Sequence, residues 1–181
     1  MFDPKIFFVL PMLMSSIGCS SEYYDQYKQE CEKRLQTSFH TTILSETEIA
    51  CLPFPVQKYL HYTGAVGKPK VYNFRSHFQG EMKRKINADW MKITAQQHEF
   101  FGDIARLFYI KSSVYGIPFD GFHRYVGDSA TMQIKIASLI KVADGKGEKM
   151  NQSETVTLFN DMCMFAPSTL IDTSIHWNLL D

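Results

Sequence analysis

The sequence lacks a surplus of either charge, because 19 lysine and arginine residues balance 19 aspartate and glutamate residues. A protein that neutralises a phosphate backbone needs an excess of basic side chains on some surface, so we expect no nucleic-acid partner. A long apolar run is also missing. The apolar stretch of residues 6–14 is about half of the ~20 residues that a helix needs to cross a bilayer, which argues against a permanent transmembrane helix there.

Motifs for cofactors and metals are missing too. Gly67-Lys68 lacks both the first glycine at the required spacing and the Ser or Thr that complete a phosphate-binding loop. None of the six histidines has a second histidine at the spacing that places two imidazoles on one helix face. No C-x-x-C pair occurs, so we expect no zinc site, at most one disulfide and buried thiols at Cys31, Cys51 and Cys163. We predict neither a cofactor nor a metal.

The composition is that of a folded protein with much aromatic surface. Apolar residues make up 45% of the chain, charged residues 21% and aromatic residues 14%. These proportions exclude a disordered chain, and the aromatic share favours sheet and large apolar contact surfaces. A length of 181 residues allows one domain with a leader.

The amino-terminal residues are typical of an export signal. Lys5 precedes the apolar run, and small residues then lead to Cys19, which resembles the bacterial lipobox. We predict a lipoprotein signal peptide over residues 1–18, lipidation of Cys19 and a helical tether over residues 19–44. Ser20 in place of Asp favours the outer membrane within the bacterial envelope, anchored through lipid. A cleaved secretory signal and a buried amino-terminal helix are the alternatives.

Beyond the tether, the periodicity predicts helices on either side of a set of strands. Ser45 and Glu48 form a capping box at the start of a helix, and a second helix is expected over residues 56–62. Apolar residues alternate with polar ones from residue 70, which predicts strands at about 70–82, 90–97, 105–111, 121–126, 131–136, 139–142 and 173–180. A loop is expected at residues 144–147 and a helix over 153–165. Short turns between these strands imply an antiparallel sheet in an α+β domain over residues 45–181.

Three ordered motifs carry a resemblance to a known family. They are LPFPVQKYL at residues 52–60 with TGAVGKP at 63–69, WMKITAQQ at 90–97, and MNQSETVTLFNDMC at 150–163 with LID at 170–172. Together they resemble an uncharacterised bacterial domain-of-unknown-function family of the "LPxPVQRYL…VGKP" type, over residues 52–181. The resemblance implies no activity and no catalytic residues.

What the resemblance implies is a fold similar to the lipoprotein-carrier (LolA/LolB-like) proteins. In such a fold a curved antiparallel sheet forms an open half-barrel, helices pack on its concave face, and an apolar cavity holds a greasy ligand. The resemblance further implies additional strands after residue 177, so the domain is expected to be incomplete at its carboxyl end.

Several side chains are candidates for contacting such a ligand. Alternate aromatic residues on the predicted strands would line the concave face, although the pattern favours the alternative that they are core packed by the helices. The candidate ligand-binding residues are Tyr72, Phe74, Phe78, Trp90, Phe108 and Asp161. Glu154, Thr157 and Asp161 share a helix stripe, which we interpret as a solvated face, with a cavity mouth and acid–base chemistry as alternatives.

The sequence therefore favours an envelope lipoprotein that binds or carries a hydrophobic small molecule or lipid non-covalently. An enzyme that acts on an apolar molecule, with Asp161 or His123 as proton-transfer group, is one alternative. A non-catalytic structural protein of the envelope is the other. Cys163 lies on an apolar stripe without an activating neighbour in sequence, so we interpret it as an inert thiol.

Overall fold

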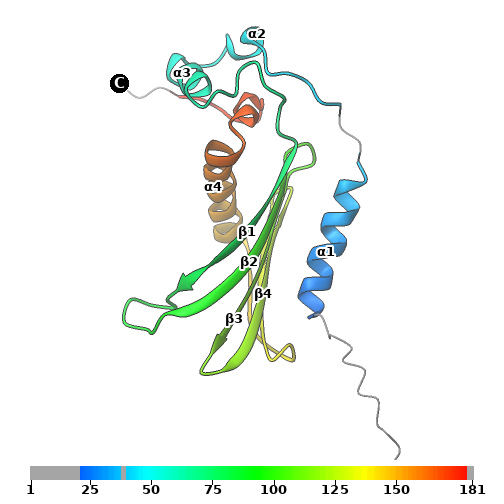
Figure 1. Cartoon of the computed structure of the whole chain (residues 1–181), viewed down its shortest axis with the longest axis vertical. Helices are drawn as coiled ribbons and strands as arrows, with labels where there is room; N and C mark the ends of the chain where they lie inside the picture. Colours follow the sequence, from blue (N-terminus) through cyan, green and yellow to red (C-terminus); the bar gives the residue numbers. More distant parts are fainter. Residues whose placement is uncertain (1–20, 38–39, 179–181) are drawn as a thin grey trace, which may run out of the picture.

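The computed structural model of this chain describes residues 21–37 and 40–178. Within them the chain forms a six-stranded antiparallel sheet with helices on both of its faces (Figure 1). The predicted signal peptide and the predicted lipidation site at Cys19 lie outside the described residues, so both stay predictions. None of the helices in the described part of the chain combines the length and the apolar character that a bilayer span requires.

The sheet is a meander in which every strand pairs with its neighbours in the sequence. Tight turns join the strands except for β1 and β2, which residues 83–90 connect, and Gly127 adopts the positive φ of 56° that the predicted hairpin turn needs. The strands are β1 (Asn73–Met82), β2 (Met91–Phe100), β3 (Ala105–Val114), β4 (Ile117–Val126), β5 (Ser129–Ile136) and β6 (Ile140–Lys146). This open antiparallel sheet with its helices confirms the predicted α+β fold class.

In the described residues, five short or medium helices pack on the sheet or lie beyond one of its ends. They are α1 (Glu22–Leu35), α2 (Glu46–Ile49), α3 (Phe54–Tyr62), α4 (Glu148–Phe165) and the 3-10 helix η1 (Pro167–Ile171). The capping box is confirmed, because the Ser45 hydroxyl accepts from the Glu48 amide while the Glu48 carboxylate accepts from the Ser45 amide.

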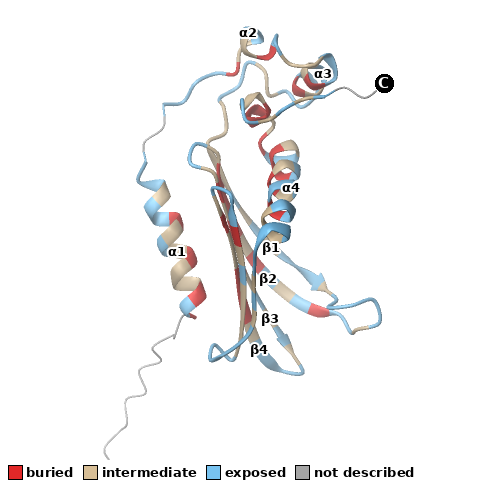
Figure 2. Ribbon diagram, turned by 180° about the vertical axis from the view of Figure 1, so that it is seen from behind, coloured by how far each residue is buried: buried red, intermediate tan, exposed pale blue. Residues whose placement is uncertain are grey.

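Helix α1 packs against one face of the sheet. Its buried residues Tyr23, Tyr27 and Cys31 pack against the apolar side chains Phe100, Leu107, Tyr109 and Phe122. Figure 2 shows the buried positions of α1 on the side of the helix that faces the sheet. The segment of residues 19–44 that the sequence predicts as a tether therefore contains a helix that belongs to the packed body. The four-residue spacing of its apolar side chains provides the stripe that is buried.

Helix α4 packs against the opposite face, which is the concave one. Figure 1 shows the far end of β1 and β2 bent toward the side on which α4 lies. The core on this side joins α4 and η1 to α2 and α3, and its buried apolar side chains include Leu44, Ile49, Leu60, Tyr125, Leu158, Met162 and Leu170. The sheet is thus a single curved layer between α1 and the α4 layer.

The structure corrects several details of the sequence prediction. Helix α4 begins at Glu148, five residues earlier than predicted. β4 begins four residues earlier than predicted, at Ile117. The predicted loop at 144–147 is mostly strand, because β6 continues to Lys146 and α4 follows directly after Gly147, whose φ is 109°. Residues 173–178 form no strand, since they follow η1 and pack Trp177 on Phe159 of α4. The Cys51 thiol is exposed instead of buried, whereas Cys31 is buried as expected.

Candidate functional site

The register of the strands arranges the side chains of the concave face in rows that cross the sheet. Opposite residues of neighbouring strands point to the same face, and successive rows lie two residues apart along each strand. The first row is Phe74, Glu99, Arg106, Tyr125 and Ala130. The second is Ser76, Gln97, Phe108, His123 and Met132, and the third is Phe78, Ala95, Ile110, Gly121 and Ile134.

Helix α4 lies across the first row. At its amino-terminal end the Asn151 side chain accepts from the Ala130 amide of β5 at 2.9 Å. In its middle, Thr155 shares a 2.8 Å hydrogen bond with the Tyr125 hydroxyl of β4. At its last residue, the Phe165 ring lies 5.2 Å from the Phe74 ring of β1. The helix therefore spans the sheet from β5 to β1 and covers one end of the concave face.

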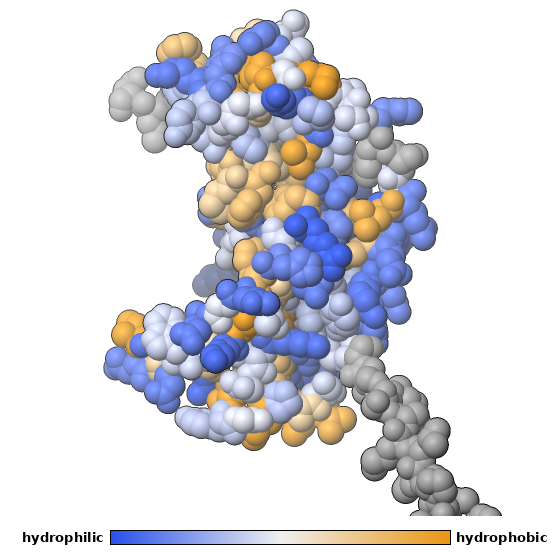
Figure 3. Space-filling view, in the orientation of Figure 1, coloured by the Kyte–Doolittle hydropathy of each residue, from blue (hydrophilic) through white to orange (hydrophobic). Residues whose placement is uncertain are grey.

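The rows beyond α4 form an apolar surface on the concave face. In the described part of the chain, no helix packs on this surface to bury it in an apolar core. Six of its side chains define what we call the trough: Phe78, Ile93, Phe108, Ile110, Met132 and Ile134. Each is half-buried or exposed, and none belongs to either packed apolar cluster. Figure 3 shows the molecule hollowed between the short helices and the bent end of the sheet, with apolar residues inside the hollow.

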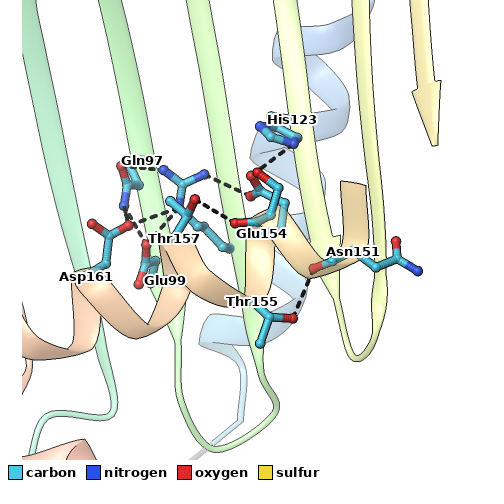
Figure 4. A network of polar contacts seen from close by, with 10 residues as sticks. Gln97, Glu99, His123, Asn151, Glu154, Thr155, Thr157 and Asp161 are labelled. Carbon is cyan, nitrogen blue, oxygen red and sulfur yellow. Dashed lines mark hydrogen bonds and ion pairs between the residues drawn. The ribbon is translucent and has the colours of Figure 1, made fainter. Parts of the chain in front are cut away.

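A buried polar network lies where α4 meets the trough (Figure 4). The Arg106 guanidinium is its centre. Its Nε lies 3.0 Å from the Asp161 Oδ2 and 3.1 Å from the Glu99 Oε1, and its Nη1 donates to the Glu154 carboxylate at 3.1 Å. Its Nη2 lies 3.4 Å from the Gln97 Oε1, and the Gln97 amide donates to Asp161 at 2.9 Å. Every nitrogen of this guanidinium thus has an acceptor.

The carboxyl groups of this network outnumber its cation. Three of them surround one guanidinium, and their side chains are almost fully buried. Burial raises the pKa of Glu99 to about 9, and the neighbouring Asp161 carboxylate adds to this effect more than Arg106 opposes it. Glu99 is therefore protonated at neutral pH and can donate a hydrogen bond, which removes one negative charge from the cluster.

His123 extends the network along the second row. Its Nε2 lies 3.4 Å from the Glu154 Oε1. Burial lowers the pKa of this imidazole, and the Arg106 charge lowers it further, although Glu154 acts in the opposite direction. His123 is consequently uncharged at neutral pH, at the border between the network and the trough.

The residues predicted to bind a ligand do not gather in one place. Phe78 and Phe108 lie in the trough, with their rings 6.3 Å apart, whereas Phe74 lies under α4 in the first row. Asp161 belongs to the network. Tyr72 precedes β1 and donates its hydroxyl proton to the His40 carbonyl, and Trp90 is 62% exposed just before β2, outside the trough.

The solvated-face interpretation of the helix stripe is wrong. Glu154 and Asp161 are buried, and Thr157 between them is half-buried, because this stripe of α4 faces the sheet. The two candidates for proton transfer, Asp161 and His123, come from distant parts of the sequence, yet they contact the same network. The inert interpretation of Cys163 stays a prediction, and burial raises the pKa of its thiol.

Arg106 and Gln97 were missed by the sequence analysis. Both are polar residues on strands whose other concave-face residues are partly apolar, and a polar residue at such a position of a strand predicts a buried polar partner. The sequence carries that signal at residue 106, where arginine interrupts the apolar face of β3. The identity of the partners on α4 is not encoded locally.

An apolar cavity lies on the other side of α4, away from the trough. Its volume is about 540 Å³. It is lined by α4, by the turn between β4 and β5 and by the segment after η1, including Tyr125, Val156, Phe159, Met162 and Ile175. In the described residues no cluster of His, Cys, Asp and Glu side chains is arranged to hold a metal ion.

The comparisons with known proteins give a family and nothing more specific. The profile of a family of unknown function, DUF6544, matches residues 42–181, which is more than half of the chain. No curated protein matches this sequence, and no solved structure matches this fold. The matched range contains the whole sheet, the trough and the polar network.

Proposed function

This chain belongs to DUF6544, a family of unknown function, and we propose from its geometry that it binds a hydrophobic molecule non-covalently in the trough. In this proposal the protein is an envelope lipoprotein, anchored through Cys19, that holds or carries a lipid-like ligand. The resemblance to the lipoprotein carriers belongs to the same proposal, supported by an open curved sheet with a helix on its concave face.

One observation carries the proposal. Helix α4 lies across the first row and contacts Gln97 and His123 of the second, whereas the apolar side chains of the trough stay outside both packed clusters. Apolar surface left exposed to water costs roughly 25 cal/mol per Å², so an exposed concave apolar surface favours an apolar occupant. Concave, mostly apolar surfaces with a few fixed polar groups are typical ligand sites.

The polar network supports a particular kind of head group. Each nitrogen of Arg106 already donates to an acceptor within the network, which engages three of the five N–H groups of this guanidinium. Carboxyl groups outnumber the cation there. An uncharged or cationic amphiphile therefore fits this end of the trough better than a fatty acid does.

Catalysis is the second candidate function, and the network is the observation that favours it. A carboxyl group whose pKa is raised to about 9 and a buried uncharged histidine are groups that can exchange protons near neutral pH. Such an enzyme would convert the molecule it binds. Mass spectrometry of a bound amphiphile after incubation with the protein separates the two candidates, because simple binding leaves the mass of the amphiphile unchanged.

The binding proposal is tested with the uncharged dye N-phenyl-1-naphthylamine, whose emission rises in apolar surroundings. We expect saturable binding to the full chain. An alcohol and an amine with a twelve-carbon tail should displace the dye at least about tenfold more effectively than the matching carboxylate, which corresponds to ~1.4 kcal/mol. An absence of saturable binding contradicts the proposed function, whereas preferred displacement by the carboxylate contradicts only the head-group assignment.

Three variants locate the bound dye. Ile110→Gln, in the trough, should weaken binding by about fivefold or more, because it places a polar amide on the apolar floor. Phe54→Gln changes an exposed aromatic residue of α3 far from the trough and should have no effect. If Val156→Gln, in the cavity of about 540 Å³, weakens binding while Ile110→Gln does not, the ligand lies in that cavity and the trough assignment is wrong.

A further inference from the structure

One end of the sheet gathers three of the five strand connections. In an antiparallel meander, alternate connections lie at the same end, so those after β1, β3 and β5 are neighbours. These connections are residues 83–90, 115–116 and 137–139, and we call them, with the strand residues next to them, the turn end. Residues 84–85, 87–91 and 113–115 line one common hollow there, which places the first two connections side by side.

The turn end exposes large apolar side chains. Ile86 is 89% exposed, Tyr115 88% and Leu139 83%, and each lies in a different connection. Trp90, the last residue of the first connection, is also exposed, as are Ile117 and Ile140 at the adjoining strand ends. Figure 3 shows apolar residues along the lower edge of the molecule, where these connections lie in Figure 1. Tryptophan and tyrosine with neighbouring aliphatic residues are typical of side chains that enter a membrane interface.

Basic residues accompany these apolar side chains. Lys83, Arg84 and Lys85 are exposed in the first connection, and Asp89 is the acidic residue of that connection. Each Lys or Arg near an anionic bilayer surface strengthens binding by about fivefold. The turn end therefore combines the apolar and the cationic components that peripheral membrane proteins use.

The amino-terminal segment joins the folded body at this same end. The Ser21 hydroxyl shares a 2.9 Å hydrogen bond with the Tyr109 hydroxyl, and Ser21 lines a hollow together with Pro118 and Ser138 of the turn end. Cys19, the lipidation site of the proposed function on which this step rests, lies two residues before Ser21. A lipid anchor at Cys19 thus brings the bilayer to the end of the body that exposes membrane-compatible side chains.

We propose that the turn end is a membrane-contact surface, which places Ile86, Trp90, Tyr115 and Leu139 in the interface of an anionic lipid bilayer. The opposite end also exposes aromatic residues, Phe54 and Tyr62 of α3, but Ser21, where the described chain begins, lies at the turn end. The surface contacts lipid whether or not the trough holds a ligand.

Tryptophan quenching by brominated lipid tests this orientation on the full chain. In a Trp177→Phe background, Trp90 is the reporter at the turn end, and Trp90→Phe with Tyr62→Trp moves the reporter to the opposite end. We expect vesicles of brominated phosphatidylcholine and phosphatidylglycerol to quench Trp90 at least about threefold more than the Tyr62→Trp reporter. Equal quenching of the two reporters, or stronger quenching at position 62, overturns the proposal.

Charge variants and lipid-free controls complete the test. Arg84→Glu with Lys85→Glu should lower the quenching of Trp90 at least about twofold at low salt, whereas Lys58→Glu, on exposed α3, should not change it. If the Arg84 and Lys85 variant is quenched as much as the parent chain, the electrostatic part of the proposal is wrong. If Trp90 emission shifts to the blue with rising protein concentration without vesicles, the turn end binds a second copy of this chain and the membrane assignment fails.

Discussion

Arg106 holds the polar side of α4 against the sheet, because its guanidinium group contacts Glu99 of β2 and both Glu154 and Asp161 of α4. A buried ion pair is costly to desolvate, and the loss of one partner leaves the other charge uncompensated. In this network the surplus negative charge is reduced by a proton on Glu99, whose pKa is raised to about 9 by burial and by Asp161. The network is therefore sensitive to pH.

At the residue scale we predict a pH dependence of stability that originates in Glu99. Its pKa rises from 4.5 to about 9 on folding, so between these pH values the folded state keeps a proton that the unfolded state releases. The contribution of this carboxyl is therefore complete below pH 4.5 and is lost as the pH rises, by up to ~1.4 kcal/mol per pH unit. Urea unfolding from pH 5 to pH 9 measures this slope.

The Glu99→Gln variant should lose that slope. The amide keeps a donor for Asp161 and cannot ionise, so we expect the variant to be more stable than the parent chain at pH 8 and similar to it at pH 4. Glu32→Gln, on the exposed side of α1, is the matched control and should keep the parent slope. A Glu99→Gln slope equal to that of the parent chain would show that Glu99 does not hold the proton.

At the scale of elements, two helices cover the two faces of the sheet in different ways. α1 packs apolar side chains against apolar strands, with the Tyr27 ring edge-on to the Phe122 ring at 6.3 Å. α4 instead places buried carboxyl groups over the sheet beside apolar contacts such as Phe165 on Phe74. The sequence pattern identifies the apolar stripe of α1, but its partner strands lie about 70 to 100 residues away along the chain.

We predict that α1 contributes strongly to the stability of the whole domain. Tyr27→Ala should lower the free energy of unfolding by ~3 kcal/mol, because it removes a large buried aromatic side chain. Leu35→Ala changes an exposed residue of the same helix and should cost less than ~0.5 kcal/mol. Equal small effects of the two substitutions in chemical denaturation would mean that α1 stands apart from the sheet as a tether.

At the scale of the molecule, the sheet is a single layer, and its strands differ in how well their backbone amides are protected from exchange with solvent. The middle strand β3 has a neighbour on each side and a helix on each face, whereas β6 is an edge strand without a buried residue. We predict that hydrogen–deuterium exchange of β6 amides is at least about tenfold faster than that of β3 amides. β1, the other edge, packs Phe74 against α4 and should be intermediate, and slow exchange in β6 would contradict this arrangement.

The sequence predicts more of the fold than of the candidate site. The alternation around Phe74 and Phe78 predicts β1, and the motif of Ser45 and Glu48 predicts α2, because both signals are local. The strand predicted at 173–180 is wrong over its described part, since alternation without a neighbouring strand cannot form a sheet. Asp161 and His123 were named as separate candidates, and Arg106, which connects them through Glu154, was not.

The sequence by itself determined the α+β class and the antiparallel order, because periodicity and short turns act between residues that are close in the chain. The tertiary structure decided the role of the stripe on α4, the placement of α1 and the extent of the trough. These depend on which row of the sheet a helix crosses and how the sheet bends. Both follow from packing between residues that are far apart in the sequence, such as Gln97 and Asp161. No local sequence pattern indicates that these two residues lie close together in space.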